Sequence, residues 1–139
     1  MMKRYETIDH TADKGIRAYG HDLKELFENA AYGMFSLMAD VDRYTPEVTR
    51  EVVVDAPDAE SLLRMWLAEL LYQFEVDEIL FVEYEIQTIT DTHVTATASA
   101  IPFNSDIEWL GSAVKAVTHH DLYVRQIDDR WEAQVILDV

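Results

Sequence analysis

Residues 59–75, AESLLRMWLAELLYQFE, combine a helical period with apolar side chains around most of the helix circumference. A helix that is apolar nearly all round must be buried on more than one side. Asp55 or Asp58 is expected to cap its N-terminus. The pattern therefore predicts a central helix packed across a sheet, with Trp66 and Phe74 buried.

A second helix is expected within residues 21–38, where apolar residues recur at three- and four-residue spacing behind an Asp22–Glu25 capping pair. Alternating or β-branched runs predict strands on either side of the two helices. These strands are expected at 3–9, 16–20, 47–57, 78–89, 92–101, 122–129 and 130–139. Residues 106–122 read as loop, strand or a short helix. Because hairpins join most neighbouring strands, we predict an α+β fold: two layers, a largely antiparallel or mixed β-sheet, two main helices and one short helix.

The chain has 139 residues, 49% of them hydrophobic, and no cysteine. Its length and its lack of linker-like stretches predict a single domain over 1–139. The absence of cysteine excludes disulfides, zinc–cysteine sites and cysteine nucleophiles. The first ten residues lack the apolar region of a signal peptide, and no apolar run is long enough to span a membrane. We expect a cytoplasmic protein with no membrane partner.

The formal net charge is −16. Proteins gain affinity for nucleic acids by neutralising phosphates with Lys and Arg, so direct, tight nucleic-acid binding is not expected. The charge is compatible with simple solubility, with a cation site, or with docking onto a basic partner.

The short insert between the first two predicted strands, Asp9 to Gly15, contains more polar and ionisable side chains than a turn requires. It carries His10 and Asp13, and its simplest interpretation is a polar turn with self-bonding aspartates. The functional interpretation is that Asp13 presents a carboxylate in a fixed loop. One aspartate rarely holds a metal ion, whereas two or three converging carboxylates can.

The opposite end of the sequence offers such carboxylates, because it finishes with Asp138 and the α-carboxylate of Val139. If the first and last strands pair, Asp13 could meet both groups. Three anionic oxygen groups suit a hard cation such as Ca²⁺ or Mg²⁺. The sequence therefore raises the hypothesis of a divalent-cation site at the chain's end.

The segment AVKAVTHHDL supplies three further candidates, Lys115, His119 and His120. The adjacent histidines point in different directions on a regular element, so they do not readily chelate one ion together. For each histidine the simple interpretation is a surface or capping role, and for Lys115 a solvated or ion-paired lysine. The functional interpretation of Lys115 is a donor to a phosphate or a partner carboxylate.

Four segments together resemble the archease family. IDHTADKGIRAYG resembles its N-terminal signature, FENAAYGMFSLM its first helix, and VKAVTHHDL and ILDV its C-terminal signatures. The similarity covers essentially the whole chain in order. One departure is His119, at a position that is commonly aromatic in the family. We expect it to alter local packing and not the role of His120.

The resemblance implies a small cytosolic accessory protein for an RtcB-type RNA ligase in tRNA splicing. Archeases help that ligase to form its guanylylated intermediate and to turn over repeatedly. The matching metal positions are Asp13, Asp138 and Val139. The cation implied is calcium, with magnesium or manganese as alternatives. Lys115, His120 and His10 are implied as functional or partner-facing neighbours.

Two other functions stay open from the sequence. One is a small metal-dependent hydrolase that uses Asp13 and Asp138, although no nucleophile or base constellation marks it out. The other is a general chaperone for RNA-modifying enzymes. We predict a protein that is not itself an enzyme.

Overall fold

The computed structural model describes residues 2–10, 13–104 and 106–139. In chain order it contains β1 (Tyr5–His10), β2 (Asp13–Gly20), α1 (Leu23–Ser36), the 3₁₀ helix η1 (Val41–Arg43), β3 (Val48–Asp55), α2 (Ala59–Asp77), β4 (Ile79–Ile89), β5 (His93–Pro102), β6 (Ala116–Val117), β7 (Tyr123–Ile127) and β8 (Arg130–Asp138). All strand pairs are antiparallel. The α+β class is confirmed.

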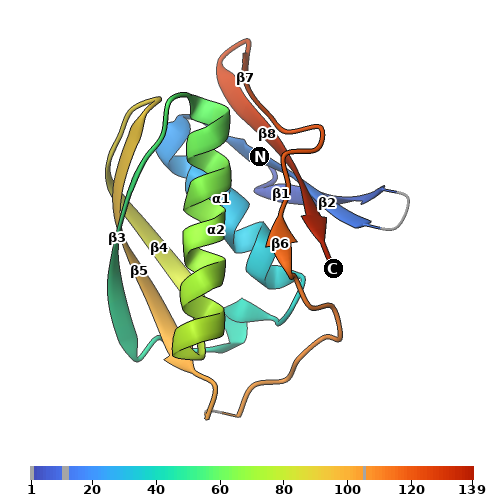
Figure 1. Cartoon of the computed structure of the whole chain (residues 1–139), viewed down its shortest axis with the longest axis vertical. Helices are drawn as coiled ribbons and strands as arrows, with labels where there is room; N and C mark the ends of the chain where they lie inside the picture. Colours follow the sequence, from blue (N-terminus) through green and yellow to red (C-terminus); the bar gives the residue numbers. More distant parts are fainter. Residues whose placement is uncertain (1, 11–12, 105) are drawn as a thin grey trace.

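The strands form two sheets, and the two α-helices lie between them (Figure 1). One sheet has the order β1-β2-β8-β6, with β7 also paired to β8; the other has the order β3-β5-β4. Both helices contact strands of both sheets. We expected two layers, with the helices on one sheet. The structure has helices between two sheets, because α2 is apolar on enough of its circumference to bury two faces.

Helix α2 begins where predicted, because the Asp58 side chain accepts a hydrogen bond from the Ser61 N–H at 2.8 Å. Trp66 is completely buried, as predicted, and its indole N–H donates to the carbonyl oxygen of Phe27 on α1 at 3.0 Å. That bond satisfies the one polar atom of the largest core side chain and ties the two helices together. Phe74 is only partly buried and packs at the rim of the core.

Helix α1 begins after Asp22, whose side chain accepts from the Glu25 N–H at 2.8 Å. Glu25 in turn accepts from the backbone N–H of His21, the residue before the cap, so the Asp22 half of the predicted capping pair is confirmed and the return bond goes to His21 in place of Asp22.

The region 106–122, described in full, is mostly irregular and contains the two-residue strand β6 and an isolated antiparallel bridge between Trp109 and Ala39. The expected short helix is found elsewhere, as η1 between α1 and β3. None of the helices formed by the described residues is long and apolar enough to cross a membrane.

Candidate functional site

The beginning of β2 and the end of β8 meet at one end of the larger sheet. Their register pairs Lys14 with Leu137 and Gly15 with Ile136. The pairing ends at Lys14 and Leu137, so Asp13 and Asp138 are each the next residue beyond the last pair, although the two are 125 positions apart in the sequence. The expected pairing was between the first and last strands, whereas the strand that pairs with β8 is the second one, β2, which carries Asp13.

Asp13 and Asp138 belong to the face of this sheet that points away from the helices. Residues 133, 135 and 137 of β8 face the helical core, so residues 134, 136 and 138 face the other way. On that outer face a Cβ added to Gly15 would lie 2.9 Å from Ile136 Cδ1 and 2.5 Å from Ile8 Cγ1. The lack of a side chain at Gly15 lets these isoleucines close over β2, and the two aspartates follow at the next position.

The opening insert is more regular than the sequence suggested. β1 and β2 form a hairpin in which Asp9 pairs with Lys14 and His10 with Asp13. The pairing of His10 places its backbone beside Asp13. The remainder of the predicted insert, residues 11–12, lies outside the described residues.

Lys115 is fixed at the same end of the sheet by its main chain. Its backbone N–H donates to the carbonyl oxygen of Asp138 at 2.7 Å, and Ala116 then pairs with Asp138. Because Ala116 shares a face with Asp138, the Lys115 side chain belongs to the opposite face. There it borders α2, in depressions that also contact Glu75.

His120 lies in the loop between β6 and β7, over the same outer face as the aspartates. Thr118 Oγ1 donates to the carbonyl oxygen of Ile136 at 2.8 Å and accepts from the His120 N–H at 3.2 Å. Gln134 Nε2 donates to the carbonyl oxygen of Asp121 at 3.0 Å. The His120 ring is exposed and lies 3.5 Å from the Asp121 carboxylate. Two side chains therefore hold this loop to β8.

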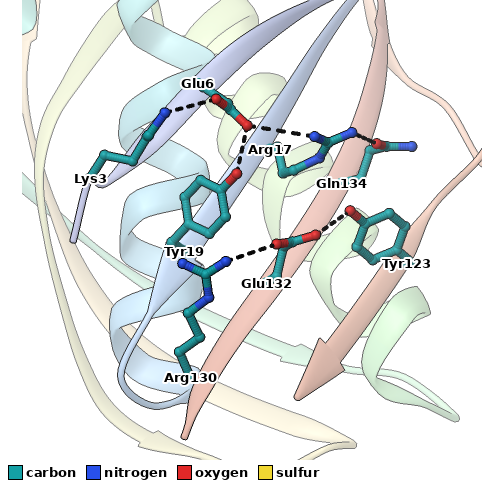
Figure 2. A network of polar contacts seen from close by, with 8 residues as sticks. All are labelled: Lys3, Glu6, Arg17, Tyr19, Tyr123, Arg130, Glu132 and Gln134. Carbon is teal, nitrogen blue, oxygen red and sulfur yellow. Dashed lines mark hydrogen bonds and ion pairs between the residues drawn. The ribbon is translucent and has the colours of Figure 1, made fainter. Parts of the chain in front are cut away.

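A polar network on the outer face connects β1, β2 and β8 (Figure 2). The guanidinium of Arg17 donates to Gln134 Oε1 at 2.8 Å and lies 3.5 Å from Glu6. Gln134 therefore links Arg17 on one side to the His120 loop on the other. Sequence reasoning did not find this network, although Arg17, Gln134 and Glu6 occupy outward positions of paired strands.

Hydrogen bonds and burial in this network shift the pKa values of Glu6 and Tyr19 in opposite directions. The hydrogen bond from Tyr19 Oη to Glu6, 2.6 Å long, lowers the pKa of the Glu6 carboxyl, with a smaller contribution from Lys3. Burial, followed by the same hydrogen bond, raises the pKa of Tyr19 to about 12. At neutral pH Glu6 is therefore ionised and Tyr19 keeps its proton.

The donor set suits a hard cation only if main-chain oxygen contributes. Among the described residues, no group of three or more His, Cys, Asp or Glu side chains is placed to hold a metal ion. Asp13 and Asp138 lie on neighbouring strands, each one residue beyond the last β2–β8 pair, and the main-chain oxygen of Val139 follows Asp138. Oxygen-only donors of this kind match calcium or magnesium.

Fold and site together define a two-sheet α+β protein in which Asp13 and Asp138 lie at one end of the larger sheet. The Archease protein family (MTH1598/TM1083) model matches residues 5–139. Protein archease of Methanosarcina acetivorans is 42% identical over 141 residues, covering 99% of this chain and 97% of its own length. Protein archease of Methanothermobacter thermautotrophicus is 39% identical and is covered completely. The chain belongs to the archease family.

Solved structures agree. The solution structure of Methanobacterium thermoautotrophicum protein 1598 superposes with a TM-score of 0.84 at 40% identity, with coverage of 99% of this chain and 100% of that one. A crystal structure from Thermotoga maritima, whose title describes an archease and possible chaperone, superposes with a TM-score of 0.68 at 18% identity, covering 100% and 98% of the two chains. The second likeness shows the shared fold.

Proposed function

We propose that this protein is a non-enzymatic accessory factor that activates an RtcB-type RNA ligase in tRNA splicing. It would promote guanylylation of the ligase and its repeated turnover. Membership of the archease family supports the accessory role. The observation that supports the finer proposal is the β2–β8 register, in which Asp13 and Asp138 each follow the last pair, with Lys115 bonded to the Asp138 main chain.

In this proposal Asp13, Asp138 and the main-chain carboxylate of Val139 hold one divalent cation, calcium in the first instance. When bound, the cation supplies positive charge that can engage phosphate oxygens. The chain's own contribution is to fix the donors: β2 and β6 pair with β8 from its two edges, so main-chain hydrogen bonds locate the last residues. His120 and His10 border the same end, and Lys115 offers a cation on the opposite face.

The acidic character of the chain supports a protein partner and not RNA as the direct ligand. A net charge of −16 repels phosphate backbones but attracts a basic, RNA-binding enzyme. Such complementarity speeds encounter and weakens as salt increases. We therefore expect stimulation of the ligase to decline with ionic strength.

The test is a multiple-turnover RNA ligation assay with the cognate ligase, GTP and a divalent metal, with and without this protein. Stimulation beyond one turnover per ligase supports the proposal. A panel of phosphoesterase and nucleotidase substrates, tested without ligase, separates the accessory role from a hydrolase. Metal-dependent turnover of that panel, abolished by Asp13→Ala, would overturn the proposal. Stimulation of several unrelated RNA-modifying enzymes would instead identify a general chaperone.

A further inference from the structure

A seam of apolar surface runs between α2 and residues 109–117, apart from the outer face that carries Asp13 and Asp138. It consists of two depressions of about 380 Å³ and about 250 Å³ that share Glu75 and Lys115. We call this feature the α2 seam. It is lined by Met38, Arg64, Ala68, Leu71, Tyr72, Phe74, Glu75, Phe103, Trp109 and residues 111–117.

The larger depression has an aromatic wall. The rings of Phe74, Phe103 and Trp109 contact one another edge to face, with centroid separations of 5.0, 5.1 and 5.9 Å. Met38 closes the floor and is almost fully buried. Rings and thioether form an apolar surface suited to an aliphatic or aromatic anchor.

Three contacts hold the exposed side of this wall in place. The Leu110 N–H donates to the carbonyl oxygen of Met38 at 2.8 Å. Glu108 accepts from Arg43 at 2.8 Å and donates its N–H to the Tyr44 hydroxyl at 2.9 Å. Trp109 is therefore presented by a tethered segment, so a partner would not have to order it first.

Several large apolar side chains around the α2 seam are exposed to solvent. Trp109 is 43% exposed, and Tyr72 and Val76, one turn apart on α2, are 60% and 59% exposed. Single exposed apolar residues are ordinary, but a group beside an apolar depression marks an interaction surface.

The charges beside the α2 seam define the kind of partner. α2 ends with the exposed acidic residues Glu75, Asp77 and Glu78, and its last turn contains no basic residue. The C-terminal end of a helix carries a partial negative charge, so these carboxylates add to an unfavourable potential. Two cations of the chain offset part of this charge: Arg50 lies 3.8 Å from Asp77, and Lys115 lines both depressions together with Glu75. A basic partner would relieve the remainder.

We propose that the α2 seam is a docking site for a segment of a partner protein that combines an apolar anchor with flanking Lys or Arg residues. The anchor enters the pocket beside Trp109, and the basic residues reach the carboxylates at the end of α2. This inference does not depend on the ligase being the partner. It adds a surface distinct from the end of the sheet that carries Asp13 and Asp138.

The experiment uses two synthetic peptides of equal length and the same apolar pattern, one of Leu and Lys and one of Leu and Glu. Binding is measured by fluorescence anisotropy of labelled peptide and by ¹H–¹⁵N spectra of the full chain. The three tryptophan indole signals act as local reporters, with Trp109 assigned through Trp109→Phe. We expect the Leu–Lys peptide to shift the Trp109 indole signal, with Trp66 and Trp131 unaffected, and the Leu–Glu peptide to bind far more weakly.

Matched variants separate docking from general attraction to an acidic protein. Glu75→Gln removes one charge at the α2 seam, and Glu85→Gln removes one from an exposed position of β4. Tyr72→Ser and Val53→Ser each remove an apolar side chain that is 60% exposed, and Val53 lies on β3. We expect the two seam variants to weaken binding by about threefold to tenfold, as for one lost contact, and the two controls to leave it within about twofold.

Equal weakening by Glu75→Gln and Glu85→Gln, or spectral shifts spread over the whole surface, would overturn the proposal. So would concentration-dependent dimerisation by light scattering that Tyr72→Ser abolishes, because the α2 seam would then be occupied by a second copy. Failure of the ligation assay alone leaves this inference standing, since none of its measurements uses the ligase.

Discussion

The backbone N–H of Lys115 donates to the carbonyl oxygen of Asp138 across 2.7 Å, so the last strand is held on both edges as far as its end. β2 holds one edge through the pairing of Lys14 with Leu137, and β6 holds the other. Main-chain hydrogen bonds therefore fix the position of Asp138, and its side chain is exposed to solvent. Changes to that side chain should separate function from folding.

The first prediction concerns Asp138→Asn. Neighbouring like charges repel in the metal-free protein, so losing one should leave the melting temperature unchanged or slightly higher. Calcium affinity, measured by isothermal titration calorimetry, should fall. Asp129→Asn, with the same change of charge in the exposed turn before β8, is the control and should bind calcium like the unmodified protein. Equal loss of affinity in both variants would show that only the overall charge matters.

The second prediction concerns Glu28, a half-buried carboxylate of α1. Burial raises its pKa above the ordinary 4.5, although the Ile86 N–H donates to it at 3.0 Å and Arg4 is nearby. The folded state therefore holds the proton more tightly than the unfolded state. This contribution to stability is present at acid pH and is lost as pH rises from about 4.5 through the raised pKa.

Glu28→Gln keeps an acceptor for Ile86 and removes the desolvated charge. We expect its melting temperature to exceed that of the unmodified protein at pH 8, with the difference vanishing toward pH 4. Glu85→Gln controls for the loss of one negative charge from an acidic protein and should show a smaller difference. A Glu28→Gln protein that melts lower than the unmodified chain at pH 8 would contradict this account of the site.

The third prediction concerns the core. Trp66 is fully buried and its indole bonds Phe27 on the neighbouring helix. Trp66→Ala should lower the free energy of unfolding by about 3–5 kcal/mol through the cavity it leaves. Urea denaturation measures this, and Trp66→Phe should cost less because it refills much of the space. A cost for Trp66→Ala near zero would mean that α2 is not the central packed element.

The fourth prediction concerns the loop that carries His120. Gln134→Met removes both the acceptor of Arg17 and the donor to the Asp121 carbonyl while keeping side-chain volume. Loss of these hydrogen bonds should cost about 1–3 kcal/mol and speed amide hydrogen exchange in residues 119–122. Exchange rates in the β3–β5 sheet should not change. Unaltered exchange in 119–122 would show that Thr118 alone holds the loop.

Local signals in the sequence located the helices well, because Asp58 and Asp22 are strong caps and each is followed by a regular apolar period. The condition for the carboxylate site named the first and last strands, and the pairing of the second strand, β2, with β8 was not foreseen. The two-sheet arrangement was not predicted either, because alternation within a strand indicates that one face is buried but not which neighbour buries it.

The remaining misses have the same origin. Residues 106–122 have no regular period, so the tether of Glu108 to Arg43 and Tyr44 was invisible before the fold brought η1 beside them. The β1–β2 hairpin was underestimated because polar residues such as Asp9 and Lys14 continue the strands almost to the turn. Long-range register, which local patterns do not encode, also placed Gln134 between Arg17 and the His120 loop.

The central claim is that the protein needs Asp13 and Asp138, at one end of the larger sheet, to stimulate an RNA ligase. The most direct measurement is multiple-turnover ligation with the full chain, with a chain lacking Asp138 and Val139, and with the Asp129→Asn control. We predict that the shortened chain keeps its fold by circular dichroism and loses stimulation, while the control stimulates fully. A shortened chain that stimulates the ligase at the full rate would contradict the claim, whatever its melting temperature.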